Sequence, residues 1–200
     1  MNIIRALVLG IGGIIFAVAL VGTASAGELE GEKYELGAFS VVLPATSGWK
    51  NQSKPNELNL GRLLGNPLHT FTLSVRQYPL VPEPGASVSV VLASFRRAAE
   101  KEMQAKGRYQ LTSHSENINI RSGLECVEYQ KTWIDHGDSI TQYKKLFMLG
   151  KGLVCIHPES ACRLVEISYS SRNSSGGVSQ EITAEGEAFI NSLRARNLGQ

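Results

Sequence analysis

The second half of the chain contains five strand-like segments that are joined by short connections. They cover residues 110–120, 124–134, 140–149, 152–156 and 163–170. A parallel crossover needs a dozen or more residues, usually including a helix, and these connections are shorter than that. Glycine in His136-Gly137 and in Lys151-Gly152 supplies the positive φ that hairpin turns need. An antiparallel sheet is therefore the fixed part of any fold that this chain can adopt.

Two earlier strands and two helices are predicted around this sheet. Apolar residues occupy every second position in 39–43 and in 71–75, which is typical of half-buried strands. Residues 88–103 have apolar side chains at helical spacing, and a helix that continues to Gly107 would span roughly 30 Å. Residues 182–193 form a second amphipathic pattern. The expected fold is α+β, an antiparallel sheet with a long central helix and a C-terminal helix.

Residues 1–26 have the three parts of a secretory signal peptide. Arg5 precedes an apolar run from Ala6 to Val21, and Ala24-Ser25-Ala26 is a cleavage site of the A-x-A kind. A membrane-spanning helix needs about 20 apolar residues, and glycines weaken this run as a helix, so cleavage is favoured over an uncleaved anchor. We expect a periplasmic or secreted protein, with no transmembrane segment after cleavage and a single globular domain at residues 27–200.

The charge balance argues against nucleic acid as a partner. The chain has 20 basic and 18 acidic residues, and loss of Arg5 with the signal peptide would leave a net charge of +1. Nucleic-acid-binding domains carry a strongly basic surface, which this balance does not provide. Gly61-Arg62-Leu63-Leu64-Gly65 lacks the Lys-Ser/Thr of a phosphate-binding loop. We expect no cofactor.

The three cysteines are expected to include one disulfide, because export places them in an oxidising compartment. Cys155 and Cys162 flank a six-residue stretch, and each adjoins a strand-like segment, so we expect them to pair across the end of a hairpin. Closing so short a loop contributes about 2 to 2.5 kcal/mol. Cys126 is then expected to be buried and inert, and a reactive thiol or an intermolecular link is the alternative.

Short segments recur in a characteristic order along the chain. They are Phe39-Ser40-Val41-Val42-Leu43-Pro44 with Gly48-Trp49, a long helix, a meander, Gly152-Leu153-Val154 before His157-Pro158-Glu159, Ile167 to Arg172, and Phe189 to Leu193. In this order they resemble bacterial PsbP-like proteins, over most of the chain after residue 26. The resemblance implies a three-layer α/β/α sandwich and a role as a binding or assembly factor. Its motifs are structural rather than catalytic, so they indicate fold more than function.

Two residues are candidates for contacts with a binding partner. Trp49 stands beside a polar connection, where an aromatic ring is a common recognition device, and such a ring equally serves to cover a sheet edge. Arg172 follows the last predicted strand. Its guanidinium could hold a bound anion, or a carboxylate or carbonyl of the chain itself.

The sequence assigns no catalytic residue and no metal ligand. A G-x-S-x-G motif is absent, and so is a CxxC pair. Asp135-His136-Gly137-Asp138 gathers two carboxylates and an imidazole, but a metal site needs three or four ligands at a recognisable spacing. We expect a solvated turn at this segment, and a structural loop at His157-Pro158-Glu159.

These observations favour an exported, non-catalytic binding or assembly protein of the bacterial envelope, which recognises a protein partner or a small ligand. A chaperone or immunity-type protein for a secreted partner is an alternative within this class. The rival hypothesis is a periplasmic enzyme, a hydrolase or a metal-dependent protein. Its site would be assembled from dispersed residues, namely His114, Asp135, His136 and His157.

Cleavage of the signal peptide gives a direct prediction. The mature protein should begin Gly27-Glu28-Leu29, because the A-x-A site ends at Ala26. Intact-mass measurement of protein recovered from the envelope fraction checks this. A protein that retains residues 1–26 would instead show an uncleaved anchor.

Overall fold

The computed structural model describes most of the chain after residue 30. The described residues are 31–66, 68–79, 89, 90, 92, 94, 97, 101, 107–137 and 145–197, with the backbone only at 161 and 162. The predicted signal peptide lies outside this set. No helix among the described residues is long and apolar enough to cross a membrane.

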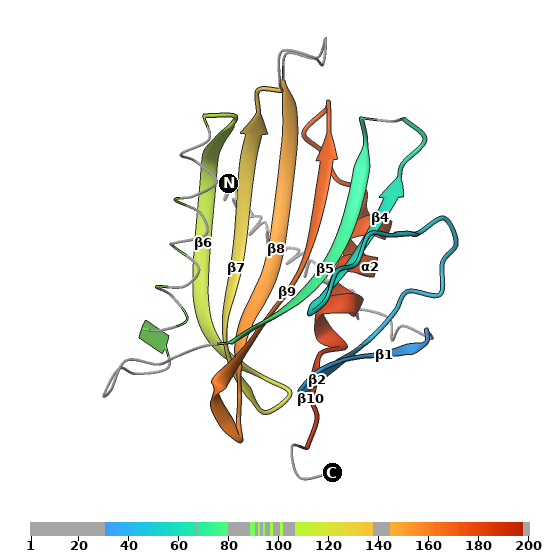
Figure 1. Ribbon diagram of the computed structural model, residues 1–200. Helices are drawn as coiled ribbons and strands as arrows, with labels where there is room; N and C mark the ends of the chain where they lie inside the picture. Colours follow the sequence, from blue (N-terminus) through green and yellow to red (C-terminus); the bar gives the residue numbers. More distant parts are fainter. Residues whose placement is uncertain are drawn as a thin grey trace, which may run out of the picture.

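The main element is a seven-stranded sheet in which all neighbours are antiparallel (Figure 1). Its order is β3 (Lys50–Asn51), β4 (Glu57–Leu63), β5 (Thr70–Pro79), β9 (Ser160–Asn173), β8 (Leu146–His157), β7 (Leu124–Asp135) and β6 (Tyr109–Arg121). The predicted antiparallel pairing is confirmed. The β6–β7 and β8–β9 hairpins turn at the lower end of Figure 1, and we use upper and lower in that sense.

One predicted turn is wrong. Lys151-Gly152 lies inside β8, so the two segments predicted at 140–149 and 152–156 contribute to one strand. The glycine serves close packing instead: a Cβ at Gly152 would lie 2.6 Å from the carbonyl oxygen of Ile167 on β9 and 2.7 Å from the Tyr129 hydroxyl on β7. At the other predicted turn, Gly137 has the expected positive φ of 74°.

A smaller sheet closes the lower end of the molecule. It has the order β1 (Lys33–Leu36), β2 (Phe39–Val42) and β10 (Arg194–Ala195), and both pairings are antiparallel. β10 follows the C-terminal helix almost directly, so the small sheet ties the end of that helix to the start of the domain.

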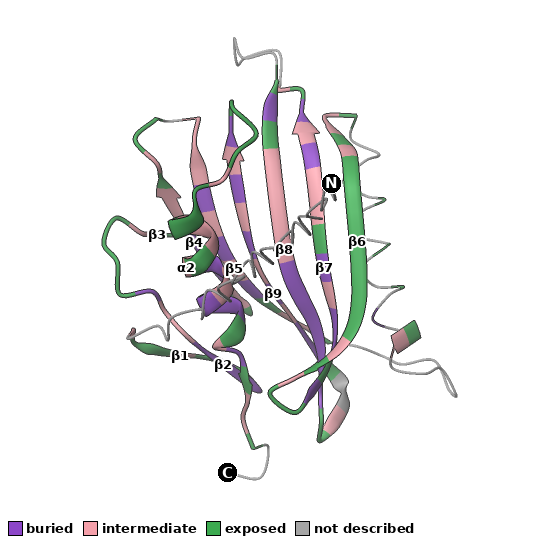
Figure 2. Cartoon of the chain, turned by 180° about the vertical axis from the view of Figure 1, so that it is seen from behind, coloured by how far each residue is buried: buried purple, intermediate pink, exposed green. Residues whose placement is uncertain are grey.

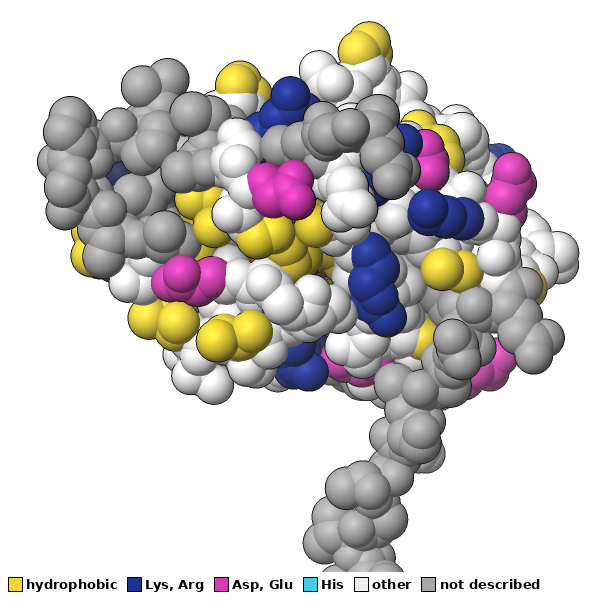
Figure 3. Space-filling model, turned by 90° about the horizontal axis from the view of Figure 1, so that it is seen from below, with side chains coloured by type: hydrophobic (Ala, Val, Ile, Leu, Met, Phe, Trp, Pro, Cys, Tyr) yellow, Lys and Arg dark blue, Asp and Glu magenta, His cyan; other side chains and the backbone are white. Residues whose placement is uncertain are grey.

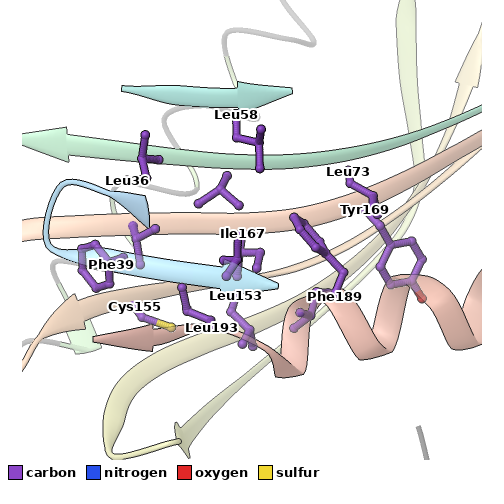
Figure 4. Packing of buried hydrophobic residues seen from close by; sticks show 14 of the residues in the cluster. Leu36, Phe39, Leu58, Leu73, Leu153, Cys155, Ile167, Tyr169, Phe189 and Leu193 are labelled. Carbon is purple, nitrogen blue, oxygen red and sulfur yellow. The ribbon is translucent and has the colours of Figure 1, made fainter. Parts of the chain in front are cut away.

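The C-terminal helix α2 (Gln180–Asn191) confirms the second predicted helix. Ser179 caps it, since its hydroxyl accepts a hydrogen bond from the Ile182 amide at 3.3 Å. Phe189 and Ile190 are buried on its inner face, in the main core with side chains of β2, β5, β8 and β9 (Figure 4). Figure 2 shows that α2 lies over the β4, β5 and β9 side of the sheet, away from β6 and β7.

A second apolar cluster occupies the opposite face of the sheet. Its strand residues alternate with those of the main core: Val154 belongs to this cluster, whereas Leu153 and Cys155 belong to the main core. Leu92, one of the described helical residues between 89 and 101, is fully buried in it. The remainder of the predicted helix at 88–103 lies outside the described residues. The structure is therefore α+β, and a three-layer sandwich with a long central helix stays a prediction.

The disulfide predicted between Cys155 and Cys162 is wrong. Cys155 is bonded to Cys126, with an S–S distance of 2.06 Å, and both residues are fully buried. The sheet register explains the difference, because Cys126 on β7 lies directly opposite Cys155 on β8, with their Cα atoms 4.1 Å apart. On its other side Cys155 faces Val165 of β9. The bond thus joins two strands inside the core.

Removing this disulfide should destabilise the domain. The two cysteines are separated by 29 positions, for which the chain-entropy estimate is about 3.5 kcal/mol. We expect the double substitution Cys126→Ala and Cys155→Ala to lower the free energy of unfolding by about 2 to 4 kcal/mol, measured by urea denaturation. Mass mapping without reduction should recover a linked Cys126–Cys155 peptide. Recovery of Cys155 linked to Cys162 would contradict the register.

Candidate functional site

Trp49 lies at the junction between the sheet and α2. It is half-buried and its ring packs on Phe71 of the main core, with ring centroids 5.5 Å apart. The Arg62 guanidinium lies 4.7 Å from the centroid of the Trp49 ring, and the indole Nε1–H donates to the Thr46 hydroxyl at 3.1 Å. These contacts engage the indole within the domain itself, as expected for a ring that covers the core.

Arg62 connects the same region to α2. It forms an ion pair with Glu185, and the side chains of Arg62 and Glu185 are only 16% and 9% exposed. Arg62 also donates to Thr46 at 3.0 Å. Because a partly buried charge must be paired and hydrogen-bonded, this pair fixes the position of α2 on β4.

Arg172, the second predicted binding residue, holds a carboxylate of its own chain. It donates to Asp135 Oδ2 at 2.7 Å, and Arg108 donates to both oxygens of the same carboxylate at 2.7 and 3.0 Å. The amide of Gly137 adds a fourth donor at 2.9 Å. Asp135 is 1% exposed. Burial raises the pKa of Asp135, but the hydrogen bonds and the two arginines outweigh it and hold the pKa below its usual value.

The four residues of the enzyme hypothesis do not meet at one place. His157 is buried at the lower end of the sheet, where its Nε2 lies 2.9 Å from the carbonyl oxygen of Arg196. Asp135 is the last residue of β7, at the upper end, and His136 follows it and contacts Gln110 at 3.1 Å. His114 lies within β6, beside Glu116 at 3.3 Å. Among the described residues, no group of three His, Cys, Asp or Glu side chains could hold a metal ion.

A hollow among the described residues lies on the α2 side of the sheet. This upper cavity has a volume of about 570 Å³ and is formed where the upper parts of β6, β7 and β8 face the start of α2. Its lining residues are Thr112, Thr132, Trp133, Phe147, Met148, Leu149, Asn173, Ser175, Gly176, Val178 and Thr183. None of these side chains carries a charge.

The wall of the upper cavity is held in place by hydrogen bonds. Asn173 accepts from the amides of Ser175 and Gly176 at 3.1 and 2.6 Å and donates to the Gly177 carbonyl at 2.8 Å, which fixes the loop before α2. On the opposite wall, the Thr112 and Thr132 hydroxyls are 2.8 Å apart. Hydroxyls near an apolar floor can orient a ligand without attracting a charged one.

A network of ion pairs lies next to the cavity, towards the lower end. Lys151 on β8 bridges Glu128 on β7 at 3.1 Å and Glu187 on α2 at 2.9 Å, and Tyr169 donates to Glu187 at 3.0 Å. Burial lowers the pKa of Lys151, but the two carboxylates outweigh it and raise the pKa above its usual value. For Glu128, burial raises the pKa, but Arg121 and Lys151 outweigh burial and hold the pKa below its usual value. The network fastens α2 beside the open part of the sheet.

Sequence reasoning did not find this cavity. Its lining residues come from four strands, a loop and a helix, and most are threonines or apolar residues that occur anywhere in a strand pattern. A weak signal was present in the loop at 173–177, which the sequence marks as a connection between the last strand and a helix.

Comparisons with known proteins give only distant likenesses. No family model and no curated protein sequence matches the chain. Among solved structures, the chain is similar to the solution structure of cyanobacterial PsbP from Synechocystis sp. PCC 6803, with a TM-score of 0.48 and 14% identity over 88% of this chain and 98% of that one. It is also similar to the lipid transfer and protein localization domain of human StarD13, with a TM-score of 0.30 and 13% identity over 74% and 89% of the two chains. The first of these is a PsbP, the kind of protein that the sequence resembles. Neither bears on what this chain binds.

The buried Asp135 carboxylate gives a prediction for stability. Asp135→Asn leaves Arg108 and Arg172 facing each other without a counter-charge, and these arginines are 31% and 25% exposed. We therefore expect a loss of about 2 to 3 kcal/mol at pH 7, somewhat less than for a fully buried pair. Urea denaturation measures it, with Glu32→Gln as the control because Glu32 is exposed.

The same variant has an expected pH dependence. Because the pKa of Asp135 is lowered on folding, its contribution is complete above about pH 4 and is lost as the pH falls through the lowered pKa. The difference between wild type and Asp135→Asn should therefore shrink by about 1 kcal/mol between pH 4 and pH 3. An unchanged difference at pH 3 would contradict the ion-pair explanation.

Proposed function

We propose that this chain is an exported, non-catalytic binding protein whose ligand is an uncharged, largely apolar small molecule bound in the upper cavity. Export rests on the predicted signal peptide at residues 1–26, and it places the mature domain in the periplasm or outside the cell. The observation that carries the proposal is the upper cavity itself. Its volume of about 570 Å³ falls in the range of small-molecule sites, roughly 300 to 1,000 Å³.

The lining of the cavity supports this class of ligand. Phe147, Leu149 and Val178 offer apolar surface, and the hydroxyls of Thr112, Thr132 and Thr183 lie around it. A ligand with an apolar body and a hydroxyl or carbonyl group would exchange its hydrogen bonds to water for hydrogen bonds to these hydroxyls, at little cost in free energy. A charged ligand would lose its hydration without meeting an opposite charge in the lining.

The supports of the cavity favour a preformed site. Phe147 is partly exposed, and its ring lies against Gly176, so a Cβ at that position would be 3.4 Å from the ring. Together with the Asn173 hydrogen bonds, this contact holds one wall before any ligand arrives. A preformed wall lowers the conformational entropy that binding must overcome.

The three-layer α/β/α arrangement is part of the same proposal. Leu92, in a helical segment, is buried in the cluster opposite α2 with Val127, Val154 and Leu164. A helix on that face would cover these residues and leave the α2 face as the one with open strands. The cavity would then lie on the less covered side of the domain.

Filling the cavity tests the proposal. Nile red, a neutral apolar dye, serves as the probe, and its emission is measured in titrations with the mature protein. We expect Thr183→Trp to weaken dye binding by about tenfold or more, because the indole occupies the cavity. Glu181→Trp is the matched control, since Glu181 lies on the same helix but is exposed and outside the lining. Equal weakening by both variants, or none by Thr183→Trp, would show that the dye binds elsewhere and contradict the proposal.

A further inference from the structure

The outer edge of β6 is unpaired in the described structure. β6 is the last strand of the seven-stranded sheet, it is 13 residues long, and β7 is its one strand partner. Figure 2 shows it exposed along most of its length. An unpaired edge presents a row of backbone N–H and C=O groups that can pair with another strand.

The upper and lower parts of this edge differ in how well they are protected from pairing with another strand. The upper part has a register irregularity between Leu111 and Ser113, and His114 lies beside the carboxylate of Glu116 there. Bulges and charges are the devices that prevent unwanted strand pairing. The lower part, residues 117–120, is Asn-Ile-Asn-Ile, and it has neither device.

The lower part of β6 also exposes apolar side chains beside a hollow. Ile118 and Ile120 are 59% and 74% exposed, which is unusual for large aliphatic residues two positions apart on one strand face. They line a lower hollow of about 510 Å³ together with Gly123, Ile156 and Pro158. Figure 3, the view from below, shows hydrophobic side chains gathered at this end with acidic side chains beside them.

Glu125 adds an unpaired negative charge to the lower hollow. It lies directly opposite Ile120 in the β6–β7 register, it is exposed, and it lines the hollow. Among the described residues, no Lys, Arg or His side chain forms an ion pair with it. The hollow therefore combines apolar surface with one free carboxylate.

We propose that the lower part of the β6 edge binds an extended segment of a partner protein by strand addition. An apolar side chain of this segment enters the lower hollow, and a lysine or arginine two positions along the segment forms an ion pair with Glu125. Strand addition satisfies the backbone groups of the edge, and pockets for alternate side chains give such binding its specificity. Residues two positions apart point to the same face of a strand, so both side chains reach the face that bears Ile118, Ile120 and Glu125.

The charges favour a partner protein over a second copy of this chain. If two β6 edges paired, each would present His114, Glu116, Ile118 and Ile120 to this face, because these alternate along the strand. That set contains no lysine or arginine for Glu125. A free carboxylate at the rim equally disfavours an anionic membrane surface.

Synthetic peptides test this surface. The probe is a nine-residue threonine-rich peptide with capped ends that contains one leucine and one arginine two positions apart, compared with the same peptide carrying glutamate for arginine. We expect the arginine peptide to bind at least about tenfold more tightly by calorimetry, and Glu125→Lys to reverse this preference. Ile120→Ser should weaken binding by about tenfold or more, whereas Leu63→Ser, at another exposed position, should not.

Three results would overturn the proposal. The first is equal binding of the arginine and glutamate peptides, or no binding of either at concentrations on the order of 1 mM. The second is unchanged binding after N-methylation of the peptide backbone, since strand addition requires those N–H groups. The third is a sedimenting dimer that Ile120→Ser dissociates, which would assign the edge to a second copy. Thr183→Trp should leave peptide binding unchanged, so this site and the upper cavity can fail separately.

Discussion

The structure depends on the long antiparallel pairing of β8 with β9 at the centre of the sheet. In their lower halves both faces of these strands are buried, so successive side chains enter the main core and the opposite cluster in turn. A shift of one residue in the register would exchange the two sets. The same register places Cys155 opposite Cys126 and brings Gly152 against Ile167, where no larger side chain fits. The disulfide and the close strand contact thus both follow from one alignment.

The position of α2 decides which part of the sheet stays open. Gly186 allows the helix to approach β9 closely, because a Cβ there would lie 2.5 Å from the ring of Tyr169. Arg62 with Glu185 on one side, and Lys151 with Glu187 on the other, then fasten the helix over β4, β5 and β9. A single helix covers only part of a wide sheet, so among the described residues no helix lies over the upper parts of β6, β7 and β8 on this face. The upper cavity lies at that boundary, between the start of the helix and the uncovered strands.

The sequence predicted the elements whose signals are local. The alternating segments and short connections gave the antiparallel sheet, and the 3.6-residue pattern at 182–193 gave α2 within two residues at each end. The prediction of a turn at Lys151-Gly152 was wrong because glycine can also mark close packing inside a strand, and only the neighbouring strands distinguish the two cases. The disulfide depended on the register between β7 and β8, which no local pattern in the sequence specifies. To predict the cavity one must know which threonines face the same space, and no spacing in the sequence contains that information.

β6 has fewer strand neighbours and fewer buried side chains than the central strands of the sheet. β8 and β9 have strand neighbours on both sides and side chains buried on both faces. Among the described strands β6 pairs with β7 alone, and it is exposed through Ser113 to Ile118. Local opening is easiest where few apolar contacts and many exposed backbone hydrogen bonds occur, so β6 should be the least stable long strand of the sheet. A segment that paired with its free edge would add a second neighbour and bury Ile118 and Ile120. Binding at this edge would then give the lower part of β6 the second neighbour and the buried apolar contacts that β8 and β9 already have.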